Sequence, residues 1–189
     1  MLGRVATNAP AAPTGHRTRD VLLDAGVAVA EEHGLAGLSI NRVVEEAGVA
    51  KGTFYVHFRD RASFVDALHE RFHRRVQDAA AAATDGVPPG ATHILLAAEA
   101  YLDVCLADRA VKALALEARS DPSLRDSMAE RHDQLAAQAI PSFKAMGWRD
   151  ATAASQLLAA MTAETALREL EAGRRLPAPR RVLRRFLGS

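Results

Sequence analysis

Residues 39–58 read SINRVVEEAGVAKGTFYVHF, and the pattern of this stretch decides the fold. Ser39 is a residue type that favours helix N-caps, so a helix is expected to begin just after it, and Gly48 suits the left-handed backbone of a tight turn. A second short helix is expected over residues 50–57. Apolar residues can hold the two helices together from the inside; they are Val43, Ala47, Val49, Phe54 and Phe58. The spacing predicts a helix-turn-helix.

Other residues of the second helix are small or able to form hydrogen bonds. Packing between the helices does not explain why these residue types stand there. A helix that enters the major groove of DNA, which is roughly 12 Å wide, needs such residues on its outer face. The outward set is Lys51, Gly52, Thr53, Tyr55 and His57. We interpret this set as a DNA-reading surface. The alternative is a buried three-helix core in which Phe54 and Tyr55 are ordinary core aromatics.

Composition favours a globular helical protein. The chain has 189 residues, of which 49% are hydrophobic and 25% charged. Its net charge of +1 gives no support to DNA binding, and neither do residues 39–61, where four basic residues face three acidic ones. Any DNA contact must therefore depend on where the charges lie. The single cysteine, Cys105, allows neither an internal disulfide nor a cysteine metal cluster. No apolar run has the length of a signal peptide or a membrane span, so we expect a cytoplasmic protein that binds no membrane.

The segment 16–76 resembles the tetracycline-repressor (TetR) type of bacterial regulators. The resemblance is carried by LLDAGVAVAEEHGLAGLSI at 22–40, AGVAKGTFYVHF at 47–58 and RDRASFVDAL at 59–68. It implies an all-α homodimer with an N-terminal three-helix, helix-turn-helix DNA-binding domain and a C-terminal helical bundle that binds an effector and dimerises. The function it implies is repression from a palindromic double-stranded DNA operator, relieved by a small molecule.

The resemblance also implies roles for nine residues as DNA contacts: Ser39, Asn41, Arg42, Lys51, Gly52, Thr53, Tyr55, His57 and Arg61. Lys51 and Gly52 are expected closest to the bases, and the others on phosphates or base edges. Two positions depart from the family pattern. Ala50 leaves the second helix without a side-chain cap, which costs about 1 kcal/mol of local stability. Val44 is bulkier than the usual alanine and should move the two helices slightly apart.

The periodicity and the resemblance together divide the chain into three parts. Residues 1–15 are expected to form a disordered tail, 16–76 the DNA-binding domain and 77–189 the effector and dimerisation domain. Within the last part, helices are expected at about 91–107, 109–119, 122–146, 150–173 and 179–187. Pro141 should kink or split the third of these. The small residues of 150–173 favour close approach of a partner helix, so it is the expected dimer helix.

Six residues of the second half are candidates for lining an effector cavity: Tyr101, Cys105, Glu117, His132, Glu164 and Arg168. A cavity inside a helical bundle is a usual place for a small apolar molecule. For each residue the alternative is a solvated face or an ion pair between helices. The basic segment 179–187 is expected to pack on the bundle near the dimer seam rather than to bind a membrane surface.

Residues 69–73 read HERFH and match the HExxH signature of zinc-dependent hydrolases. In that signature His69 and His73 would bind the metal and Glu70 would act as a base. The metzincin extension is missing, and no sheet is apparent. We therefore expect no enzyme, no catalytic or metal-binding residue and no cofactor, with these side chains on an exposed helix face. A third possibility is a helical ligand-binding module without DNA binding.

Overall fold

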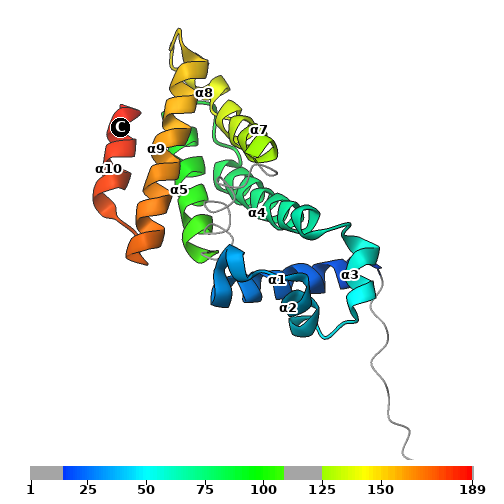
Figure 1. Cartoon of the computed structure of the whole chain (residues 1–189). Helices are drawn as coiled ribbons and strands as arrows, with labels where there is room; N and C mark the ends of the chain where they lie inside the picture. The colour runs from blue at the N-terminus through cyan, green and yellow to red at the C-terminus, as the bar shows by residue number, and fades with distance from the viewer. Residues whose placement is uncertain (1–14, 109–124, 189) are drawn as a thin grey trace, which may run out of the picture.

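The computed structural model describes residues 15–108 and 125–188, and every element in these ranges is an α-helix. The prediction of an all-α protein is confirmed. The helices are α1 (Gly15–Gly37), α2 (Ile40–Glu46), α3 (Lys51–His57), α4 (Arg61–Thr84), α5 (Ala91–Ala107), α7 (Arg125–Ala137), α8 (Ile140–Ala145), α9 (Ala151–Ala172) and α10 (Pro177–Phe186). Figure 1 shows α1–α3 at one end, α5 and α7–α10 at the other, and α4 between them. The expected tail, apart from Gly15, and the expected helix 109–119 lie outside the described residues.

The two helices on either side of Gly48 lie where the sequence predicts, α2 directly after Ser39 and α3 within the expected range 50–57. The helix of α1 is interrupted at Gly34, whose φ is 66°. Ser39 caps α2, because the backbone N–H of Arg42 donates to its Oγ at 3.3 Å. Gly48, with a φ of 64°, turns the chain from α2 into α3. One core joins these helices to the first half of α4, and its buried residues include Leu22, Val43, Phe54, Phe58 and Phe64.

α4 belongs to both halves of the molecule. It begins with a capping box, in which Asp60 Oδ1 accepts from the N–H of Ser63 at 2.7 Å and Ser63 Oγ accepts from the N–H of Asp60 at 3.1 Å. Leu68 lies in the N-terminal core, whereas Phe72, one turn later, lies in the core of the C-terminal bundle. The domain boundary expected after residue 76 therefore falls inside a continuous helix.

The C-terminal half is a bundle arranged around α9. α5 packs on both α4 and α9, and α7, α8 and α10 pack on α9. Pro141 splits the expected helix 122–146 into α7 and α8, and it lies in the first turn of α8, where a missing N–H breaks no hydrogen bond. Leu183 and Leu187 are buried in the bundle core, so the basic C-terminal segment packs on the bundle as expected.

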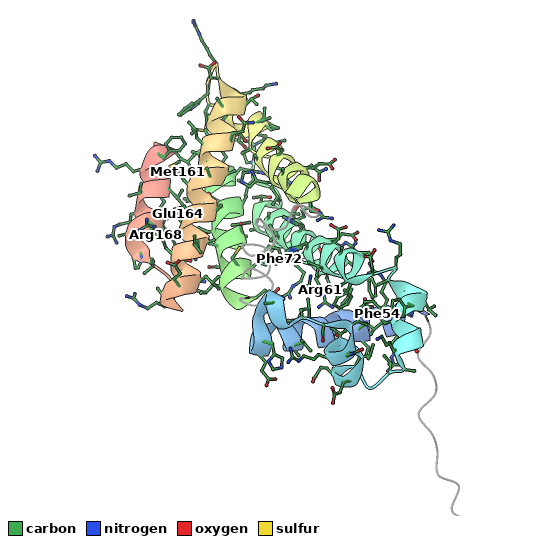
Figure 2. The ribbon with its side chains drawn as sticks, viewed as in Figure 1. Phe54, Arg61, Phe72, Met161, Glu164 and Arg168 are labelled. Carbon is green, nitrogen blue, oxygen red and sulfur yellow. The ribbon has the colours of Figure 1, made fainter. Side chains whose placement is uncertain are left out.

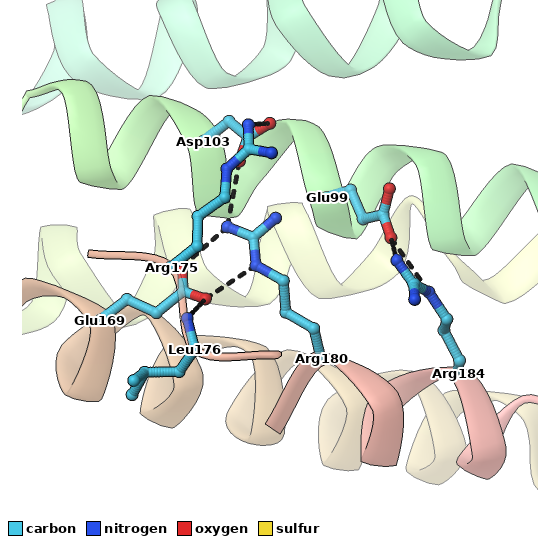
Figure 3. Close-up of polar contacts among 7 residues, drawn as sticks. All are labelled: Glu99, Asp103, Glu169, Arg175, Leu176, Arg180 and Arg184. Carbon is cyan, nitrogen blue, oxygen red and sulfur yellow. Dashed lines mark hydrogen bonds and ion pairs between the residues drawn. The ribbon is translucent and has the colours of Figure 1, made fainter. Parts of the chain in front are cut away.

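Ion pairs fasten α10 and the turn before it to α5 and α9 (Figure 3). Glu169 is 1% exposed, and its carboxylate accepts from Arg180 Nε and Nη2, each at 2.7 Å, and from the N–H of Leu176 at 2.8 Å. Asp103 of α5 accepts from Arg180 at 3.0 Å and from Arg175 at 2.7 Å. Burial alone would raise the pKa of Glu169, but the hydrogen bonds and charge of Arg180 and the Leu176 N–H outweigh it and hold that pKa below its usual value.

Candidate functional site

α3 presents an exposed face at the end of the molecule away from α9 and α10 (Figure 1). Lys51 and Tyr55 are exposed, and so are Gly52 and Val56, with Tyr55 at 51% and Val56 at 78%. Residues four apart lie on the same side of a helix, so these two pairs form one outer face. The opposite side carries Phe54, which is fully buried. We call Lys51, Gly52, Tyr55 and Val56 the recognition stripe.

Aromatic contacts hold α3 against the rest of the N-terminal domain. The ring of Phe54 lies 5.4 Å from that of Phe58 and 5.3 Å from that of Phe64, measured between centroids (Figure 2 labels Phe54). The guanidinium of Arg19 on α1 lies 5.3 Å from the Phe58 ring centroid. Contacts from α1 and α4 thus fix the orientation of α3, while its recognition stripe stays open.

Packing does not explain the glycine at position 52. Apart from its two chain neighbours and the backbone of its own helix, no heavy atom of the described residues lies within 4 Å of the place that a Cβ at Gly52 would take, and its φ is not positive. A glycine inside a helix costs roughly 0.5–1 kcal/mol relative to alanine. Gly48 differs, because its positive φ requires glycine for the turn. Packing against the described residues outside its own helix therefore does not require a glycine at position 52.

The structure places the nine expected DNA contacts on α2, α3 and the residues beside them. Six are exposed, namely Ser39, Asn41, Arg42, Lys51, Gly52 and Tyr55, and three are half-buried, namely Thr53, His57 and Arg61. Arg42 Nη1 donates to the carbonyl of Gly37 at 2.8 Å, and Arg61 Nε donates to that of Leu38 at 2.7 Å. These two arginines fix the turn between α1 and α2. Contact with DNA stays a prediction for all nine.

The two atypical positions have distinct outcomes. Among the described residues no side chain caps the N-terminus of α3, which confirms the expectation for Ala50. Val44 is buried in the N-terminal core. Its effect on the separation of α2 and α3 stays a prediction.

A cavity of about 530 Å³ lies between α4, α5, α7 and α9. Two of the expected ligand contacts line it, Tyr101 from α5 and His132 from α7. His93 of α5 also lines it, and sequence reasoning missed this residue. The spacing of four that links His93, Ala97 and Tyr101 would have indicated one shared helix face.

Three of the other expected ligand contacts, Cys105, Glu164 and Arg168, do not line this cavity. Cys105 is buried in the bundle core. Glu164 and Arg168 pair with each other at 2.7 Å along the exposed face of α9 (Figure 2), which is the solvated alternative considered for them. Glu117 lies outside the described residues. Val56 is a recognition-stripe residue that the predicted outward set omitted, although its spacing of four from Gly52 places it there.

The HExxH segment is not the exposed face that the sequence suggested. His69 is fully buried, because it lies three, four and seven residues from core positions of α4. Glu70 is exposed and pairs with Arg74 at 2.8 Å. Within residues 15–108 and 125–188, no three His, Cys, Asp or Glu side chains are grouped as a metal site requires. No observation on the described residues favours a zinc hydrolase.

α9 and α10 expose apolar residues on the surface of the bundle. Leu157 of α9 and Val182 of α10 are each 61% exposed. Ala153 and Ala160, also exposed, flank Leu157 at helical spacing on the helix that was expected to form the dimer. None of the helices in the described ranges combines the length and the hydropathy needed to cross a bilayer.

Comparison with known proteins identifies the N-terminal region. Residues 22–68 match the family model described as bacterial regulatory proteins, tetR family. Over 69 residues the chain is 33% identical to the HTH-type transcriptional repressor NemR of Escherichia coli K12. That match covers 34% of this chain and 35% of the repressor, so the chain aligns with about a third of the length of the curated relatives it matches.

Solved structures share the fold over almost the whole chain. A transcriptional regulator from Rhodococcus sp. Rha1 has a TM-score of 0.78 at 20% identity, covering 90% of this chain and 94% of that one. A putative TetR-family regulator from Syntrophomonas wolfei has a TM-score of 0.78 at 13% identity, covering 93% and 95%. The multidrug binding protein EbrR complexed with imidazole has a TM-score of 0.71 at 24% identity, covering 93% and 96%. These likenesses show a common fold.

Proposed function

We propose that this chain, whose residues 22–68 match the tetR family of bacterial regulatory proteins, is a cytoplasmic transcriptional regulator of that family, which binds operator DNA through α3 and is released by a small molecule. The observation that carries the proposal is the recognition stripe. It is exposed on a helix whose other side is locked into a core, and it contains a glycine that packing does not require.

In the proposed complex α3 lies in the major groove. Lys51 and Tyr55 can donate hydrogen bonds to base edges or phosphates, and Val56 can contact a thymine methyl group. Gly52 lets the helix backbone come close to the bases. Sequence discrimination then arises from a few groups on the recognition stripe, which agrees with the nearly neutral charge of this region.

We propose a two-fold dimer formed through α9 and α10. The exposed side chains of Leu157 and Val182 supply apolar surface for such an interface, and the alanines beside Leu157 allow close helix packing. A symmetric dimer reads a palindromic operator, with recognition helices about 34 Å apart, one turn of DNA.

α4 is the proposed path from effector to DNA. Its second half lines the cavity with Gln77 and Thr84, and its first half carries core residues that hold α3. Arg71 of α4 pairs with Asp24 of α1 at 2.7 Å, so α1 follows α4 when it shifts. A ligand that favours a different position of α4 would lower operator affinity by a coupling of about 1–3 kcal/mol, or roughly 5- to 150-fold.

Selection of bound sequences from random duplex DNA tests the proposal. We expect enrichment of palindromes, and binding of the selected duplex that weakens steeply with salt. A Lys51→Ala, Tyr55→Ala double variant, which changes only exposed side chains, is the matched control and should enrich nothing. If the wild-type chain enriches no sequence, the alternative of a helical ligand-binding module without DNA binding replaces this one.

A further inference from the structure

The wall of the cavity indicates the chemical class of the effector, and this inference rests on the proposed function of the cavity. Each of the four helices around it contributes alanine, including Ala80, Ala97, Ala136 and Ala159. Their short side chains leave the space open and line it with methyl groups. The surface offered to a ligand is therefore mainly apolar.

Charged groups are missing from the described part of this wall. No lining residue in the described ranges carries a carboxylate, an ammonium or a guanidinium group. An ion buried without a counter-charge loses its hydration and gains no partner, which is strongly unfavourable. The two threonine hydroxyl protons of the wall are also committed, since Thr84 and Thr162 donate to the carbonyls of Ala80 and Leu158, each at 2.8 Å. The described part of the wall thus favours an uncharged ligand.

His93 supplies an acceptor of defined geometry. Its Nδ1 lies 3.0 Å from the carbonyl oxygen of Val87, in the linker before α5. A carbonyl oxygen only accepts hydrogen bonds, so Nδ1 carries the proton of the neutral ring. Nε2 on the other side of the ring then has a lone pair and accepts hydrogen bonds.

We propose that the effector is an uncharged, mainly apolar molecule that donates a hydrogen bond, from a hydroxyl or an N–H, to Nε2 of His93. Its shape is elongated, because His93, Ala97 and Tyr101 follow one another along α5 at a spacing of four. His93 and Tyr101 are thus about 12 Å apart along the helix axis. Lipophilic cations do not fit this description, since the described wall offers them no carboxylate.

Four biphenyl probes of nearly equal size test the charge and the hydrogen bond separately. They are 4-phenylphenol, which is neutral and a donor; 4-methoxybiphenyl, which is neutral without a donor; biphenyl-4-carboxylate; and 4-phenylbenzylammonium. Binding to the full-length protein is measured by isothermal titration calorimetry at pH 7.5. We expect 4-phenylphenol to bind about tenfold more tightly than its methoxy analogue, and both ions to bind more weakly than 4-phenylphenol.

Two substitutions of His93 form a matched pair. In His93→Asn the amide N–H can replace Nδ1 and keep the hydrogen bond to Val87, but no acceptor remains at the place of Nε2. In His93→Gln the amide oxygen reaches the place of Nε2. We expect the Asn variant to bind 4-phenylphenol and 4-methoxybiphenyl equally, and the Gln variant to keep a preference for the phenol. Ala97→Phe, which fills the cavity, should abolish binding of both, and circular dichroism checks that each variant is folded.

The outcomes separate this inference from the proposed function. Tighter binding of either ion, equal binding of the two neutral probes, or an unchanged preference in His93→Asn would each overturn the assignment of the effector class. So would failure of all four probes to bind a protein that still binds its selected operator, and the proposed function would then stand. If the wild-type protein binds 4-phenylphenol more tightly than the other three probes but binds no operator DNA, the proposed function alone would be overturned.

Discussion

Replacing Gly52 by alanine should make the protein more stable and a weaker DNA binder. The position is helical and exposed, and no described heavy atom outside the neighbouring residues and backbone of α3 lies within 4 Å of the new methyl group. Without any clash, only the helix propensity changes, which favours alanine by about 0.5–1 kcal/mol. For 189 residues the entropy of unfolding is about 0.4 kcal/mol per kelvin, so the Tm should rise by about 1–3 °C.

The same methyl group should interfere with DNA. It would lie on the recognition stripe between Lys51 and Val56, where packed atoms approach to about 3.5–4.0 Å. Moving α3 outward to accommodate it weakens its base contacts, each of which is worth about 1–3 kcal/mol. We therefore expect operator affinity to fall by about tenfold or more, because 1.4 kcal/mol corresponds to a factor of ten.

Two measurements on one preparation check this pair of expectations. Thermal melting followed by circular dichroism gives the Tm, and fluorescence polarisation with the selected operator at fixed salt gives the affinity. Thr152→Ala is the matched control, since it also raises helix propensity at an exposed position but lies on α9, away from α3. The reasoning is refuted if Gly52→Ala binds the operator as tightly as the wild type, or if it melts at a lower temperature.

Three further predictions follow from the described contacts. Glu169→Gln should lower the free energy of unfolding by about 3 kcal/mol in urea titrations at pH 7, because it leaves the buried charge of Arg180 incompletely paired. The pKa of Glu169 is depressed in the folded state, so its contribution to the free energy of unfolding is present above the unfolded carboxyl pKa of about 4.3 and is lost as the pH falls through the folded-state pKa. The difference in free energy of unfolding between variant and wild type should therefore narrow in acid, and a difference that stays constant with pH would contradict the assignment. Lys51→Ala should weaken operator binding by about tenfold, measured by polarisation at fixed salt, because it removes a hydrogen-bond donor close to the bases; unchanged affinity would remove this lysine from the DNA contacts. Leu157→Glu should convert the dimer to a monomer in light scattering, and a persistent dimer would place the interface elsewhere.

Local patterns made the helices and the turn of the DNA-binding unit predictable. Ser39, Gly48 and Pro141 each act within a few residues of themselves, through a cap, a positive φ and a missing N–H, so the sequence indicates their effect directly. The exposed stripe of α3 follows from a spacing of four, and that spacing also contains Val56, which the predicted set omitted.

Contacts between distant residues were not predictable in the same way. Arg180 pairs with Glu169 and with Asp103, which is 77 positions away. The pattern of basic residues in the segment 179–187 is equally compatible with a helix face exposed to solvent. His69 is buried because α4 has apolar neighbours on two sides, which a single helical stripe does not reveal. The cavity depends on alanines from four helices, and no one segment shows that they converge.

The continuity of α4 through both cores has a consequence for cooperativity. Leu68 and Phe72 are consecutive turns of one helix but belong to different cores, so the helix cannot unwind at one end without exposing apolar surface at the other. The two halves are then expected to melt in one transition rather than two. A molecule bound in the bundle would slow amide hydrogen exchange in α1 and α3 as well. The DNA-binding domain would thus gain protection from exchange through a ligand that it does not contact.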